Sequence, residues 1–117
     1  MTNPSKARGT RLERTVAVYL AAALNDDRIE RCALNGVKDR GDIAGVRTPT
    51  GDRVVIEVKN TARMSIGVLI NEVEVEKGND DARVGVCVHK RHGKAAPGEQ
   101  LVTMRLEDFA RLLGGDL

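Results

Sequence analysis

The chain has very few aromatic residues. Among its 117 residues, tryptophan is absent, and Tyr19 and Phe109 are its single Tyr and Phe. The core must therefore be built from Val, Leu, Ile and Ala, and base stacking on aromatic platforms is disfavoured as a binding mode. The chain also lacks a run of the ~18 apolar residues that a membrane-spanning helix requires. A membrane partner is therefore not expected.

Cysteine is scarce as well. Cys32 and Cys87 lie far apart, and the N-terminus has no apolar segment of the secretory type. This pattern is typical of a reduced, cytoplasmic protein. His89 and His92 could join the cysteines as zinc ligands, but a Cys-x-x-Cys knuckle is missing, so the sequence does not indicate a zinc site.

A strong net charge is also missing, because 19 Lys and Arg residues nearly balance 17 Asp and Glu residues, which leaves +2. The basic residues are nonetheless clustered, near the N-terminus and after residue 89. The two clusters are Lys6, Arg8, Arg11 and Arg14, and Lys90, Arg91 and Lys94. Such patches suit contact with phosphates, although charged surfaces that only face solvent have the same composition.

The length and the 41% hydrophobic content predict one globular domain. Residues 1–9 are polar, so we expect a flexible basic arm there and a single domain over 10–117. From Thr10, apolar residues recur at spacings of three and four, which predicts a helix that ends near Asn25.

Periodicity predicts five strands and two further helices. The strands are expected over 29–34, 42–46, 53–59, 84–89 and 101–105, and the helices over 65–78 and 107–113. The continuous apolar run over 84–88 indicates burial on both faces and hence a central strand. The order α-β-β-β-α-β-β-α predicts an α/β (α+β) fold in which helices flank a mixed central sheet.

A hairpin is predicted where the turn-forming sequence Thr48-Pro49-Thr50-Gly51-Asp52 joins two strands. Alternation along the second strand places Glu57 and Lys59 on one face. If the hairpin is symmetric about Pro49-Thr50, residues whose numbers add to 99 face each other, and Asp42 lies opposite Glu57. Cross-strand neighbours are about 5 Å apart at Cβ, so one divalent ion could bridge the two carboxylates. A slip of one residue would separate them.

Asp42, Glu57 and Lys59 together fit the hydrolysis of a phosphodiester, in which a metal-bound water attacks the phosphate. Asp42 and Glu57 offer hard oxygen ligands for Mg²⁺, or for Mn²⁺ in its place, together with the backbone carbonyl of Val58. Lys59 would orient the water or neutralise charge on the phosphate. A Glu-x-Lys on its own is more often an ordinary exposed strand, so the shared face and the hairpin symmetry carry the prediction.

Four segments of the chain match one family in order. They read Arg8-Gly9-Thr10-Arg11-Leu12-Glu13-Arg14, Gly41-Asp42-Ile43, Ile56-Glu57-Val58-Lys59 and Val86-Cys87-Val88-His89-Lys90. They resemble the PD-(D/E)XK nuclease superfamily, and within it the archaeal-type Holliday junction resolvases. One departure is Gly41, where the name of the superfamily has Pro.

The resemblance implies a restriction-endonuclease-like core and a Mg²⁺-dependent, structure-selective endonuclease that cuts four-way DNA junctions in recombination or repair. It also implies that the two basic clusters contact the DNA backbone without reading its sequence. Resolving a junction takes two nicks, so a two-fold homodimer is expected. No small organic cofactor is expected.

Several interpretations stay open. By the resemblance, Glu13 is a catalytic acidic residue that approaches the metal, but Thr10-x-x-Glu13 is also a capping box at a helix start. Glu72 and Glu76 either contact the site or lie on a solvated helix face, which is the simpler interpretation. The same motifs would fit another nuclease of the superfamily, of the nicking, repair or restriction-like kind. They would also fit a non-catalytic DNA-binding module on this fold.

Overall fold

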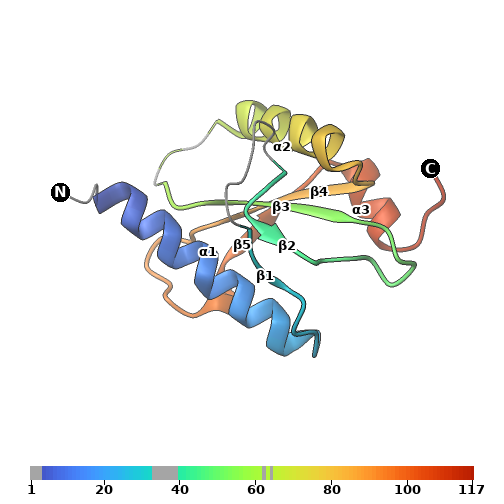
Figure 1. Cartoon of the computed structure of the whole chain (residues 1–117). Coiled ribbons are helices and arrows are strands. Elements are labelled where there is room, and N and C mark those ends of the chain that lie inside the picture. Colours follow the sequence, from blue (N-terminus) through green and yellow to red (C-terminus); the bar gives the residue numbers. More distant parts are fainter. Residues whose placement is uncertain (1–3, 33–39, 62, 64) are drawn as a thin grey trace.

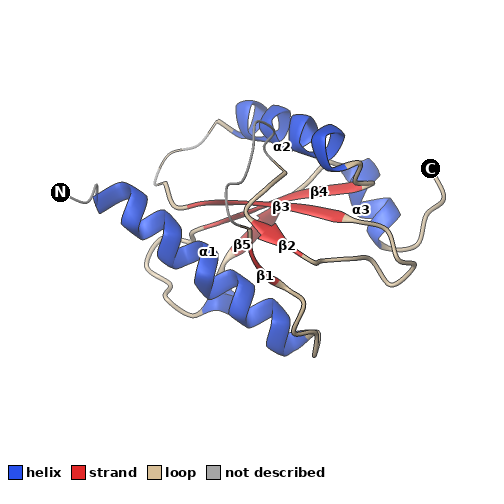
Figure 2. Cartoon of the chain, in the orientation of Figure 1, coloured by secondary structure: helices blue, strands red, loops and turns tan. Residues whose placement is uncertain are grey.

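A single mixed sheet forms the centre of the fold, with helices on both faces (Figures 1 and 2). A computed structural model describes residues 4–32, 40–61, 63 and 65–117. The elements in these residues are α1 (Pro4–Ala23), β1 (Glu30–Arg31), β2 (Ile43–Ala44), β3 (Val54–Lys59), α2 (Ile66–Asp80), β4 (Val84–His89), the 3-10 helix η1 (Pro97–Glu99), β5 (Leu101–Thr103) and α3 (Leu106–Leu112). The predicted order of helices and strands is confirmed, and η1 is an addition to it.

The strands lie side by side in the order β1-β2-β3-β4-β5. β3 and β4 are parallel, and the other neighbouring pairs are antiparallel. A parallel pair needs a crossover connection, which α2 provides. β4 lies between β3 and β5 and is buried over 84–88, which confirms the predicted central strand.

The two faces of β3 meet different helices. On one face, Ile56 and Val58 pack with Leu12 and Val16 of α1. On the other face lies α2, which Figure 1 shows across the sheet from α1. Because side chains alternate along a strand, Glu57 and Lys59 point to the side of α2. We call this side of the sheet the α2 face.

The first helix begins earlier than predicted. Residues 4–9 were expected to lie in a flexible arm, but α1 starts at Pro4 and includes Lys6, Arg8 and Gly9. Proline is well suited to a first helical position, since its fixed φ is already helical and its missing N–H has no partner there anyway. Residues 1–3 of the expected arm, and residues 33–34 of the first expected strand, lie outside the described residues.

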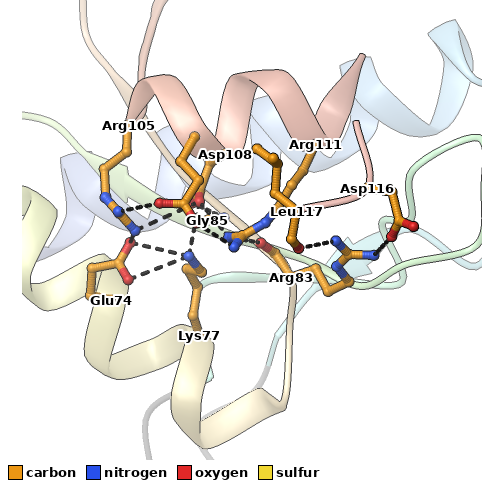
Figure 3. Close-up of polar contacts among 10 residues, drawn as sticks. Glu74, Lys77, Arg83, Gly85, Arg105, Asp108, Arg111, Asp116 and Leu117 are labelled. Carbon is orange, nitrogen blue, oxygen red and sulfur yellow. Dashed lines mark hydrogen bonds and ion pairs between the residues drawn. The ribbon is translucent and has the colours of Figure 1, made fainter. Parts of the chain in front are cut away.

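Charged side chains attach α3 to the rest of the fold (Figure 3). Asp108 is 0% exposed and accepts hydrogen bonds from Lys77 Nζ of α2 at 3.0 Å and from the backbone N–H of Gly85 at 2.9 Å. Arg111 Nη1 adds a third contact with Asp108 at 3.2 Å. The opposite side of α3 is apolar and exposed, with Leu106 and Phe109, and the exposed Leu113 follows at the end of the helix. α3 therefore buries its charged side and turns its apolar side outward.

Candidate active site

An extra residue sets the register of the hairpin between β2 and β3. Next to the turn, Arg47 pairs with Arg53, and further along Ile43 pairs with Ile56. Between these two pairs, the chain that leads back to β2 covers four residues, from 47 to 43, while the chain of β3 covers three, from 53 to 56. The additional residue forms a β-bulge around Gly45, whose φ is 87°. The predicted register is confirmed at Ile43 and Ile56, but a bulge and not a symmetric turn produces it.

The bulge decides which face Asp42 occupies. If the pairing at Arg47 and Arg53 continued unchanged, Asp42 would lie opposite Val58 and point to α1. With the additional residue, Asp42 shares the α2 face with Glu57. Glycine is required at the bulge, because a Cβ on Gly45 would lie 2.4 Å from the carbonyl oxygen of Arg28.

Gly41 brings the chain close to β3 just before Asp42. The N–H of Asp42 donates to the carbonyl of Ile56 at 2.8 Å. Gly41 has a φ of 90°, and a Cβ on it would lie 2.9 Å from the same carbonyl oxygen. Proline cannot adopt this φ. The local geometry therefore excludes proline at the position before Asp42.

Asp42 is held by the backbone and surrounded by negative charge. Its Oδ2 accepts a hydrogen bond from the N–H of Val58 at 2.7 Å. The pKa of Asp42 is raised to about 7, chiefly by burial; the bond from Val58 acts to lower it, and the charges of Glu57 and Glu13 contribute to the rise. A cation at this position would relieve the repulsion among the carboxylates.

Glu57 is buried, and its two carboxylate oxygens differ in their surroundings within the described part of the chain. The residue is 7% exposed, and its Oε1 lies 3.4 Å from Lys59 Nζ. Its Oε2 has no hydrogen-bond partner among the described residues. Leaving a buried acceptor unpaired costs about 1–3 kcal/mol, and more for a charged group. Such an oxygen is suited to bind a cation.

Lys59 lies between acidic residues from two elements. Besides Glu57, its Nζ contacts Oε2 of Glu72 on α2 at 3.1 Å. Burial acts to lower the pKa of Lys59, but the hydrogen bond and charge of Glu72, together with Glu57, outweigh it and raise the pKa. Lys59 is therefore held as a cation on the α2 face.

Glu13 reaches the site from α1. Its Oε2 accepts a hydrogen bond from Arg31 Nε at 2.8 Å, and its side chain lies within hydrogen-bonding reach of Asp42. Because α1 starts at Pro4, Thr10 lies inside the helix and is not its N-cap. The capping-box interpretation of Glu13 is therefore wrong. Its position beside Asp42 agrees with the other interpretation.

Sequence reasoning underestimated the acidic residues of α2. Glu72 contacts Lys59, although 46% of its side chain is exposed. Glu76 is buried at 3% exposure, so the solvated-face interpretation is wrong for it. Both residues border the stripe of Leu69 and Val73 that packs on the sheet. Their spacing beside this apolar stripe was the feature of the sequence that could have predicted their position close to the sheet.

The site offers few but suitable ligands for a metal. In the described part of the chain, no three His, Cys, Asp or Glu side chains are gathered closely enough to form a ready-made metal centre. Mg²⁺ needs fewer, since it usually keeps several waters and takes one or two carboxylates. Asp42 and Glu57 fit that requirement. The carbonyl of Val58 points to the same strand edge as its N–H, which faces Asp42.

The start of α1 and the loop after β4, which carry predicted DNA-contacting residues, adjoin the end of β3 that carries Lys59. Asn60 Nδ2 donates to the carbonyl of Arg8 in α1 at 3.4 Å, and the N–H of Lys90 donates to the carbonyl of Lys59 at 3.1 Å. Exposed positions on α1 are held by Lys6, Arg8, Arg11 and Arg14.

The loop after β4 uses part of its positive charge to hold itself in place. Lys90 Nζ donates to the carbonyls of Arg91 and Lys94, and Arg91 forms an ion pair with Glu99 at 2.7 Å. Lys94 is exposed. Of the three predicted contacts in this loop, Lys94 therefore presents its charge most freely to solvent.

Protein-family models, curated proteins and solved structures give no match to this chain. Among the described helices, none combines the length and the apolar character needed to cross a bilayer. The functional interpretation therefore depends on the geometry of the residues themselves.

Proposed function

We propose that the chain is a metal-dependent, structure-selective DNA endonuclease of the Holliday junction resolvase type, with a restriction-endonuclease-like core. One observation supports this most directly. Asp42 and Glu57 share a sheet face beside Lys59, and the buried Glu57 keeps an oxygen without a partner among the described residues. A module that only binds DNA has no use for so costly a carboxylate.

Each residue of the site has a task in the proposed chemistry. A Mg²⁺ held by Asp42 and Glu57 would supply an activated water and polarise the phosphate. Lys59, fixed between Glu57 and Glu72, would donate a hydrogen bond to a phosphate oxygen or to the attacking water. The N–H of Val58 fixes the carboxylate of Asp42. Glu13, held by Arg31, approaches Asp42 from the opposite side of the sheet.

We infer that the substrate is DNA because exposed cations of α1 and of the loop after β4 adjoin the site. These groups can contact phosphates without reading bases. A four-way junction has two strands to cut, and a two-fold homodimer would present one site to each of them. The resolvase type and the homodimer are therefore parts of the same proposal.

A cleavage assay on a synthetic four-way junction tests the proposal. We expect paired nicks in Mg²⁺ or Mn²⁺, none after chelation by EDTA, and a rate at least about 100-fold lower for Glu57→Gln, since even partners of metal ligands affect metal sites 10–100-fold. Glu107→Gln is the matched control, because it removes an exposed glutamate on α3. It should cleave like the wild type.

Two results would contradict the proposal in different ways. Equal or faster cutting of linear duplex would replace the resolvase type with another nuclease of the superfamily. Junction binding without cutting in either metal, at an affinity unchanged by Asp42→Asn, would favour a non-catalytic DNA-binding module.

A further inference from the structure

Three arginines surround a hollow that the functional site leaves unused. The hollow has a volume of about 320 Å³ and lies between β2, the start of β3 and the end of α2. Among the described residues, its charged lining consists of Arg40, Arg47, Arg53 and Asp80, and residues 43–46 form part of its wall. We call it the arginine hollow.

Positive charge dominates the arginine hollow. Arg47 Nη1 donates to the carbonyl of Gly51 at 2.8 Å, and Arg53 Nη1 donates to the carbonyl of Asp80 at 3.0 Å. These backbone acceptors orient the guanidinium groups without neutralising them. The carboxylate of Asp80 lies 3.9 Å from Arg53. In the described part of the lining, three cations therefore face one carboxylate, and a concave wall strengthens their attraction for anions.

Arg40 is the most available of the three cations. It is exposed, and it forms no hydrogen bond or ion pair with another residue in the described part of the chain. A guanidinium can bind two oxygens of one phosphate at once. Arg40 can therefore turn to an anion without giving up an existing contact.

The arginine hollow lies on the same side of the sheet as the candidate site. Arg53 immediately precedes β3 and lies four residues before Glu57, so both point to the α2 face and are separated by about 13 Å at ~3.3 Å per residue. Arg47 pairs with Arg53 and shares this face, and Arg40 precedes Asp42 by two residues. The distance corresponds to the rise of roughly four base pairs along the axis of a DNA duplex, at ~3.4 Å each.

We propose that the arginine hollow binds a backbone phosphate of the DNA whose scissile phosphate occupies the site at Asp42 and Glu57. This inference rests on the proposed function. The predicted DNA contacts on α1 and after β4 adjoin the Lys59 end of β3, whereas the hollow adjoins the opposite end. DNA is thus held on both sides of the cleavage position.

Binding measured as a function of salt tests the inference. A labelled four-way junction is titrated with Arg40→Gln, Arg47→Gln and the double variant in Ca²⁺ without Mg²⁺, under conditions that prevent cutting. Each phosphate contact changes the slope of log K against log salt by about one. We expect the slope to fall by about one in each single variant and by about two in the double variant.

The control removes the same charge elsewhere. Arg28 is exposed and its guanidinium is held by Asp26 at 2.9 Å. Arg28→Gln should leave the salt slope unchanged. If Arg28→Gln lowered the salt slope by the same amount, the effect would come from the lower net charge of the protein and not from the hollow. That result would overturn the inference. Circular dichroism of each variant checks that the fold is retained. We expect it to be retained, because Arg40 and Arg47 are exposed.

Other outcomes separate this inference from the proposed function. If the wild type binds and cuts DNA and the double variant keeps the full salt slope, the inference fails and the function stands. If the wild type neither binds nor cuts DNA, both fail. Stabilisation by inorganic phosphate that the double variant loses, with DNA binding unchanged, would make the hollow a site for small anions and would also overturn the inference.

Discussion

Lys59 depends on a residue that belongs to another element. Its own strand supplies Glu57, but the closer contact, at 3.1 Å, is with Glu72 of α2. A lysine side chain is long and flexible, and its charge is mobile unless partners fix it. The position of Lys59 in the site is therefore set jointly by β3 and α2.

Glu72→Gln should lower the rate of cleavage by about tenfold, the lower end of the effect for residues that orient the groups of a metal site. The free energy of unfolding should change by less than about 1 kcal/mol, because both partners of the ion pair are partly exposed to solvent, at 32% and 46% of their side chains. Single-turnover cleavage and urea denaturation measure the two effects.

Glu74→Gln is the matched control for this prediction. Glu74 also lies on α2 and pairs with a lysine, Lys77, but it belongs to the charged cluster of α3. It should leave the cleavage rate near that of the wild type. An equal loss of rate in both variants would mean that Glu72 acts only through the stability of α2.

At the level of elements, the β-bulge around Gly45 brings the catalytic candidates onto one face. Strand alternation and the register of Ile43 with Ile56 could be read from the sequence, because they follow from side-chain periodicity and a turn signal. The bulge could not. It depends on the close approach of Gly45 to the backbone of Arg28, which is distant in the sequence. The predicted register was right although its assumed cause was wrong.

Gly45→Ala should lower the free energy of unfolding by at least about 2 kcal/mol, since a positive φ and a backbone clash both oppose the side chain. It should also weaken Mg²⁺ binding, because Asp42 follows the register of the bulge. Denaturation and calorimetric titration with Mg²⁺ measure these effects.

Gly51→Ala separates the two causes. Gly51 also has a positive φ, 92°, but a Cβ there meets nothing within 4 Å. We expect a cost of about 1–2 kcal/mol from the backbone conformation alone and unchanged Mg²⁺ affinity. A loss of affinity in this variant equal to that of Gly45→Ala would contradict a specific role for the bulge.

For the whole molecule, the sequence predicted the elements better than their ends and their charged contacts. The order of elements follows from local periodicity, so it was accessible. The start of α1 was not, because Pro4 and Gly9 are signals of loops as well as of a helix start. The burial of Glu76 and Asp108 was also missed. Charged residues are seldom buried unless paired, and the partners of Asp108 come from α2 and β4.

Asp108→Ala should destabilise the whole molecule by about 3 kcal/mol, the lower end of the cost of removing one partner from a buried ion pair, because Glu74 remains near Lys77. Urea denaturation followed by circular dichroism measures it. Glu107→Ala, on the exposed side of the same helix, should cost less than about 1 kcal/mol. Equal effects of the two substitutions would show that the burial of Asp108 adds nothing.

The same buried charge has a consequence for the order in which the protein is made. Lys77 and the N–H of Gly85 emerge from the ribosome before Asp108, which accepts hydrogen bonds from both. Until residue 108 has been synthesised, Lys77 can pair with Glu74 but lacks its second carboxylate, and the N–H of Gly85 lacks the acceptor that Asp108 provides. α2 and β4 therefore gain their full set of polar contacts only after the third helix has been translated.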